Sequence, residues 1–182
     1  GSTTHSDAGV TSLDHCRAVL ERMEERDVVL QLHGEATGND VDPYDRESIF
    51  IERELLPLVR RHPRLRIVLE HVTTIAGVGF VRAQGLRVAA TLTPQHLLLN
   101  RGAMFAGGLR PHLYCLPILK RERHRRALVA AATGGNAKFF LGTDSAPHAR
   151  GTKECASGCA GIYSAHAALE SYAAVFEAEG AL

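Results

Sequence analysis

Short apolar runs that alternate with helical patterns are the feature that most constrains the fold of this chain. The runs occupy residues 28–32, 66–69, 86–92 and 138–142, and stretches with apolar residues at three- and four-residue steps separate them. Continuous apolar strands that alternate with helices are typical of a parallel sheet covered by helices. We therefore expect an α/β fold with about four parallel strands.

The helical stretches have recognisable boundaries. A capping pattern at Thr11–Asp14 opens the first, a second follows Asp42-Pro43 and has Pro57 as a kink, and a third covers 75–84. Two more are predicted over 121–132 and 162–178. The segment 97–120, which precedes the helix predicted over 121–132, is rich in Gly and Pro, and long irregular segments inside compact domains are usually functional.

Polar residues follow the apolar runs at the same end. His33, His71, Thr93 and Asp144 each stand at or just beyond the end of a predicted strand. In an α/β barrel this end of the strands carries the active site. A closed barrel of that type needs eight strands, so about four strands correspond to half of one.

Two of these residues are histidines and one is an aspartate, a set that suits a zinc ion or a similar divalent cation. A single His at a strand end is more often a hydrogen-bonded polar residue than a ligand. The repeated placement of His33 and His71, together with Asp144, favours a metal site. A carboxylate beside such a site can also transfer a proton during hydrolysis.

Charge and cysteine usage exclude several classes. The formal net charge is +1, from 21 basic and 20 acidic residues, which gives no reason to expect nucleic acid or an anionic membrane as a partner. No apolar run approaches the ~20 residues of a membrane span. The 4 cysteines are too few and too scattered for a secreted disulfide framework, so a cytoplasmic protein is expected.

Five motifs carry a resemblance to a known family. They are HGE at 33–35, EHVTT at 70–74, TLTPQHLLLNR at 91–101, GGLRPHLYCLPILKRERHR at 107–125 and GTDSAPHARGTKE at 142–154. In this order they resemble bacterial dihydroorotase of the homodimeric, free-standing type, within the amidohydrolase superfamily. The resemblance covers nearly the whole chain and implies the second half of a (β/α)8 barrel as a single partial domain, 1–182.

The resemblance implies a zinc enzyme that reversibly closes N-carbamoyl-L-aspartate to dihydroorotate in pyrimidine biosynthesis. By analogy with the family motifs, His33 and His71 would bind one zinc ion. Asp144 would bind the other and act as general base or acid. His148 would contact the carboxylate of the substrate.

Four further positions match substrate contacts of the family. The backbone of Leu116, in YCLP, and of Ala160, in GCAG, would contact the pyrimidine ring. Thr3 and Thr4 match a Thr-Thr pair on a loop that closes over the substrate. The resemblance also implies a homodimer for the full-length protein.

Some family features are not present in this sequence. The family has a His-x-His pair and a carboxylated lysine that bridges two zinc ions, and no His-x-His occurs among the 182 residues. We therefore expect that the chain is a fragment of a longer protein and that it is inactive alone.

Two alternatives stay open. A different cyclic amidase, such as a hydantoinase, would share the strand-end His, His and Asp. A non-catalytic relative could keep the barrel as a scaffold for a partner enzyme, although such relatives usually lose their metal ligands.

Overall fold

The computed structural model describes residues 9–10 and 12–182. In this part of the chain, four strands form one sheet in the order β1-β2-β3-β4, and all three pairings are parallel. The strands are β1 (Val29–His33), β2 (Arg66–Glu70), β3 (Val88–Leu92) and β4 (Phe139–Leu141). The predicted α/β architecture with four parallel strands is therefore confirmed.

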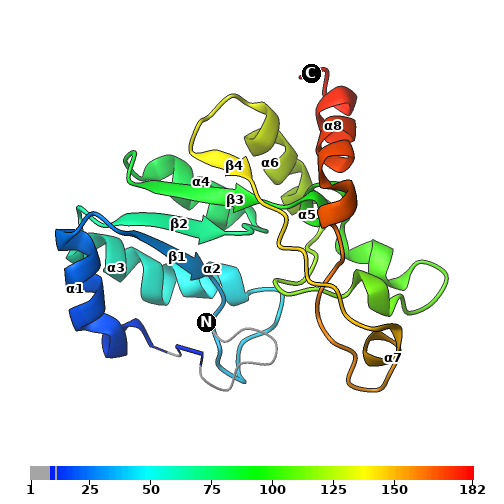
Figure 1. The fold of residues 1–182 in the computed structure, drawn as a ribbon, viewed down its shortest axis with the longest axis horizontal. Helices are drawn as coiled ribbons and strands as arrows, with labels where there is room; N and C mark the ends of the chain where they lie inside the picture. Colours follow the sequence, from blue (N-terminus) through cyan, green and yellow to red (C-terminus); the bar gives the residue numbers. More distant parts are fainter. Residues whose placement is uncertain (1–8, 11) are drawn as a thin grey trace.

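Helices connect successive strands. The α-helices are α1 (Arg17–Glu25), α2 (Arg46–Phe50), α3 (Leu56–Arg61), α4 (Ile75–Ala83), α5 (Pro94–Leu98), α6 (Glu122–Thr133), α7 (Arg150–Lys153) and α8 (Ala168–Ala178). The strand arrows in Figure 1 all point toward the side of the molecule where α5 and α7 lie. This shared direction gathers the residues that follow the strands at one edge of the sheet.

The core lies between the sheet and its helices. Leu69 of β2 and Leu92 of β3 are completely buried, as are Leu55 and Val81 from the helical layer. Helix α6 packs against both α4 and α5. Burial of such side chains stabilises the fold by about 1.5–3 kcal/mol each. Among the described residues, none of the helices has the length and the apolar composition of a membrane span.

Two predicted element starts are corrected by the structure. The third strand begins at Val88 rather than 86, because Leu86 is 94% exposed and lies in a turn closed by a hydrogen bond from the Val88 amide to the Gly85 carbonyl. The last helix begins at Ala168 rather than 162, after a 3-10 turn at Ala165–Ala167. Its expected first turn is instead extended, because Ile162 pairs with Ser145.

Pro57 does not break the second predicted helix. A π-helical turn, Ile51–Leu55, joins α2 to α3, and the Leu56 amide donates to the Ile51 carbonyl five residues earlier. A proline has no amide hydrogen to donate, and here it stands in the first turn of α3, directly after the wider turn, where the helix tolerates it.

The segment 97–120 is irregular, as expected. After α5 it contains two 3-10 turns, Arg101–Phe105 and Pro111–Leu113. A small cluster of buried side chains, Met104, Cys115 and Leu119, anchors it separately from the main core. The segment therefore has a fixed path over the carboxyl ends of the strands.

A buried carboxylate in α2 holds the loop that follows β2. Glu47 is 2% exposed, and its two oxygens accept four hydrogen bonds. The donors are the backbone amides and the side-chain hydroxyls of Thr73 and Thr74, at 2.5–2.9 Å. Gly77 is required beside it, since a Cβ there would lie 2.5 Å from Glu47 Oε1.

We predict that Glu47→Ala lowers the free energy of unfolding by about 3 kcal/mol or more, because hydrogen bonds to a charged group contribute about 1.5–3 kcal/mol each and four buried donors lose their acceptor. Glu52, an exposed carboxylate on the next turn, provides the control. Glu52→Ala should change the free energy by about 0.5 kcal/mol or less. Urea unfolding of both variants tests this, and equal losses would contradict it.

Candidate metal and substrate site

One cavity of about 260 Å³ opens at the carboxyl ends of the strands. All the predicted site residues that the structure describes line it: His33, His71, Leu116, Asp144, His148 and Ala160. They come from the ends of β1, β2 and β4, from the irregular segment and from the loop after α7. Residues far apart in the sequence therefore share one cavity.

The two histidines face each other directly. His33 Nδ1 lies 3.0 Å from His71 Nε2, with the rings in an edge-to-face arrangement. His33 Nε2 lies 3.0 Å from Glu35 Oε2, and a carboxylate can only accept, so this nitrogen carries the hydrogen. Nδ1 of a neutral His33 therefore presents a lone pair toward His71.

This arrangement is that of a metal ligand oriented by a carboxylate. Metal-binding histidines usually donate their second ring N–H to a carboxylate or a carbonyl, which fixes the tautomer. Burial, followed by the charge of His33, holds the pKa of His71 well below its usual range. His71 is therefore neutral at physiological pH, which is the form that binds metals. Its Nδ1 atom is buried without a hydrogen-bond partner among the described residues.

The backbone at His71 is strained and is held by its neighbour in β3. His71 has a φ angle of +40°, which non-glycine residues seldom adopt. The Thr91 hydroxyl accepts a hydrogen bond from the His71 amide and donates one to Glu70, both at 2.6 Å. Val72 donates to the Thr91 carbonyl at 3.1 Å. These bonds keep the imidazole turned into the cavity.

Asp144 has the same unusual conformation, with a φ angle of +41°. Gln95 of α5 donates from Nε2 to the carbonyls of Thr143 and Asp144, at 3.2 and 3.4 Å. The side chain keeps contact with solvent, but loss of hydration on the cavity side raises its pKa to about 6. The charge of His33 opposes this rise and that of Glu70 adds to it.

The remaining predicted residues form the opposite wall. His148 Nε2 lies 2.9 Å from the Ala160 carbonyl and donates to it. Leu116 precedes Pro117, whose carbonyl accepts a hydrogen bond from His96 Nε2 at 2.8 Å. His96 is thus a buried residue that fixes a loop. Burial raises the pKa of the neighbouring Cys115 to about 12, so its thiol stays protonated.

Thr3 and Thr4 lie outside the described residues. Within the described part of the chain, no group of three or more His, Cys, Asp or Glu side chains is arranged to hold a metal ion. His33 and His71 form a pair, and Asp144 lines the same cavity without joining them. The donors fit zinc in type, since two neutral imidazoles and a carboxylate are its common ligands.

Sequence reasoning missed three supporting residues. Glu35 orients His33, Thr91 holds the backbone of His71, and Glu47 holds the loop beyond it. Glu35 has a visible signal, since it stands two residues after His33 in the HGE motif. For Thr91 and Glu47 the contacts depend on strand register and helix packing, which a single sequence does not show.

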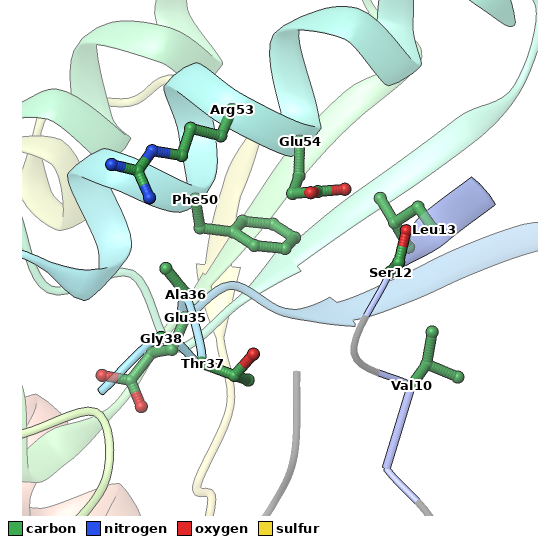
Figure 2. Close-up of a pocket in the computed structure, with 10 residues that line it drawn as sticks. All are labelled: Val10, Ser12, Leu13, Glu35, Ala36, Thr37, Gly38, Phe50, Arg53 and Glu54. Carbon is green, nitrogen blue, oxygen red and sulfur yellow. The ribbon is translucent and has the colours of Figure 1, made fainter. Parts of the chain in front are cut away.

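A second cavity, of about 180 Å³, lies on another side of Glu35 (Figure 2). Figure 2 shows Phe50, Arg53 and Glu54 projecting from α2 and the π-helical turn over the loop that contains Glu35. None of the predicted metal ligands lines this cavity. Glu35 connects the two regions, because it both lines the second cavity and contacts His33.

Comparison with known proteins identifies the relatives of this chain. No family model matches it. A dihydroorotase from Aromatoleum aromaticum is 65% identical over all 182 residues, which span 53% of the length of that protein. The crystal structure of dihydroorotase from Saccharomyces cerevisiae, in complex with 5-fluoroorotic acid, matches the whole chain with a TM-score of 0.90 and 35% identity. The chain is a homologue of dihydroorotase.

This dihydroorotase homologue spans about half the length of the curated relatives it matches, and 53% of the yeast chain. An L-hydantoinase from Arthrobacter aurescens also has the same fold, with a TM-score of 0.72 over 90% of this chain. Its sequence identity is 18%, so this likeness extends to the fold alone. The sequence comparison thus points to dihydroorotase, the same family that the five motifs resemble.

We predict a pH-dependent difference between the metal-free chain and its Asp144→Asn variant. The raised pKa means that the folded state favours the protonated carboxyl. Its stabilising contribution is complete below about pH 4 and is lost as the pH rises through about 6. The amide introduced by Asp144→Asn does not titrate, so the variant should gain stability relative to the parent between these values.

Because Asp144 is partly solvated, we expect a gain of under about 1 kcal/mol at pH 7. Urea unfolding at pH 4.5 and pH 7.5 measures the difference, and NMR of the Asp144 carboxyl carbon locates the midpoint. A midpoint near 4, with no change in the relative stability, would contradict the prediction.

Proposed function

We propose that this chain is part of a dihydroorotase, which reversibly converts N-carbamoyl-L-aspartate to dihydroorotate in pyrimidine biosynthesis. The observation that carries the proposal is the single cavity that collects the two histidines, Asp144 and the predicted substrate residues. High identity to proteins named dihydroorotase supports the substrate class. The yeast relative was crystallised with 5-fluoroorotic acid, which supports an orotate-like ligand for this site.

Zinc would be held by His33 Nδ1 and His71 Nε2, the two nitrogens that face each other, and by the Asp144 carboxylate. When bound, zinc supplies a Lewis acid that polarises a carbonyl and lowers the pKa of water. The remaining ligands, a His-x-His pair and a carboxylated lysine, would come from the rest of a longer protein. We accordingly propose that the 182 residues alone do not turn over substrate.

Asp144 would transfer the proton. A group with a pKa of about 6 is half protonated at pH 6 and mostly ionised at pH 7, so it can accept a proton in hydrolysis and return it in cyclisation. Its strained backbone fixes the carboxylate at the cavity wall. His148 would bind the carboxylate of the substrate, and the backbone of Leu116 and Ala160 would contact the ring. Thr3 and Thr4 would close over it.

The same proposal includes a cytoplasmic location and a homodimer for the full-length protein. A hydantoinase-like activity has weaker support, because the similarity to hydantoinases is one of fold. A scaffold role also has weaker support, since His33, His71 and Asp144 are all present at the cavity.

The experiment compares this chain with a version extended to the full length of the relatives. We expect the extended protein to hold about two zinc ions and to hydrolyse dihydroorotate, whereas the 182 residues do neither. His33→Ala and His71→Ala in the extended protein should each abolish activity and lower the zinc content. His112→Ala is the control, because His112 is an exposed residue paired with Glu154.

Zinc is measured by elemental analysis, and turnover is assayed with dihydroorotate and with hydantoin in parallel. An extended protein that holds zinc but acts on hydantoin alone would refute the proposed substrate. Full activity from the 182 residues would refute the proposal that the remaining zinc ligands come from the rest of a longer protein.

A further inference from the structure

A buried lysine joins the segments that form the substrate wall of the cavity. Lys153, at the end of α7, is 3% exposed. Its Nζ donates to the backbone carbonyls of Tyr114 at 3.0 Å, Cys159 at 2.7 Å and Gly161 at 2.7 Å. The Tyr114 ring adds a cation–π contact, with its centroid 5.9 Å from Nζ.

The chemistry of the ammonium group matches this environment. An ammonium has three N–H donors and no acceptor, and here each donor has a carbonyl. A buried charge is costly unless hydrogen bonds replace its hydration. The partners of Lys153 are backbone carbonyls. Its hydrogen bonds therefore restrain the path of the chain at these three residues.

The three carbonyls flank the two predicted backbone contacts. Tyr114 stands two residues before Leu116, and Cys159 and Gly161 stand on either side of Ala160. A hydrogen bond from the Gly161 amide to the Tyr114 carbonyl, at 2.9 Å, joins the same two segments. Lys153 therefore clamps Leu116 and Ala160 into one wall.

The packing at Gly161 leaves little freedom for this wall. Gly161 has a φ angle of +151°, and a Cβ at this position would lie 2.5 Å from the Ala146 carbonyl oxygen. A small shift of the 159–161 segment would therefore meet the backbone that follows Asp144. The bonds of Gly161 to Tyr114 and to Lys153 hold the segment in this close packing.

We propose that Lys153 is a positioning residue for substrate binding, which sets the spacing between the backbone of Leu116 and that of Ala160. This inference rests on the proposed function, because it assigns that wall to the substrate ring. Lys153 acts on affinity, through the ring contacts, and leaves the proton transfer at Asp144 unchanged.

Lys138 provides a matched control. Its Nζ also donates to backbone carbonyls, those of Gln84 at 2.6 Å and Arg82 at 3.4 Å. It immediately precedes β4, at the opposite end of the sheet from the cavity. Lys153→Met and Lys138→Met each remove an ammonium group that donates to backbone carbonyls. The first removes it beside the cavity and the second removes it away from the cavity.

The first test uses the 182 residues and needs no activity. Amide hydrogen exchange of Gly161, read by NMR, should accelerate about tenfold or more in Lys153→Met, because the clamp on its acceptor segment is lost. Lys138→Met should leave this amide unchanged. Unchanged exchange in Lys153→Met would overturn the proposal.

The second test uses the extended, zinc-loaded protein with dihydroorotate. Lys153→Met should raise KM about tenfold, with kcat within about threefold and with zinc content unchanged. Lys138→Met should change neither constant. An unchanged KM, or a loss of kcat or zinc instead, would overturn the positioning role.

Lys153→Gln, which keeps part of the donor capacity, decides the matter if Lys153→Met does not fold. Its KM should lie between the KM of the parent and a tenfold higher value. A KM equal to that of the parent would overturn the proposal. If the unsubstituted extended protein does not act on dihydroorotate, the proposed function fails. The exchange experiment would then show separately whether Lys153 holds the wall.

Discussion

The register between β1 and β2 is the constraint on which the site depends. His33 pairs with Glu70, so the residue after Glu70 begins level with the end of β1. This register brings His33 and His71 to a nitrogen separation of 3.0 Å. A shift of one residue would turn every side chain of β1 to the other face of the sheet and would separate the imidazoles. The buried leucines of both strands therefore fix the geometry of the polar site.

Strain is concentrated where the site needs unusual side-chain directions. His71 and Asp144 both have positive φ angles, each directly or shortly after a strand. Such conformations cost about 1–3 kcal/mol each and persist when neighbouring bonds determine them. At His71 the determining bonds come from Thr91, and at Asp144 from Gln95. Thr91 and Gln95, which do not line the cavity, thus maintain the conformation of His71 and Asp144, which do.

The sequence was sufficient for the architecture, because the apolar runs give a periodic signal, and its motifs and strand ends named six of the residues that line the cavity. Apolar runs predicted four parallel strands, and strand-end placement singled out His33, His71 and Asp144. The start of the last helix was not predictable, since the pairing of Ile162 with Ser145 is a long-range contact. Lys153 was not predictable for the same reason: its three acceptors approach it only in the folded chain.

Carboxylates and the one buried lysine described above lie on opposite sides of the cavity, and this distribution of charge supports the proposed chemistry. Glu35 and Glu70 lie beside the paired histidines, and the charge of Glu70 helps to raise the pKa of Asp144. A cation bound by His33 and His71 would offset this repulsion and would lower that pKa. On the opposite wall the buried charge is positive, that of Lys153, and its donors are engaged by backbone carbonyls. The negative wall therefore suits a metal ion, whereas the opposite wall offers backbone edges and His148 to an anionic ring.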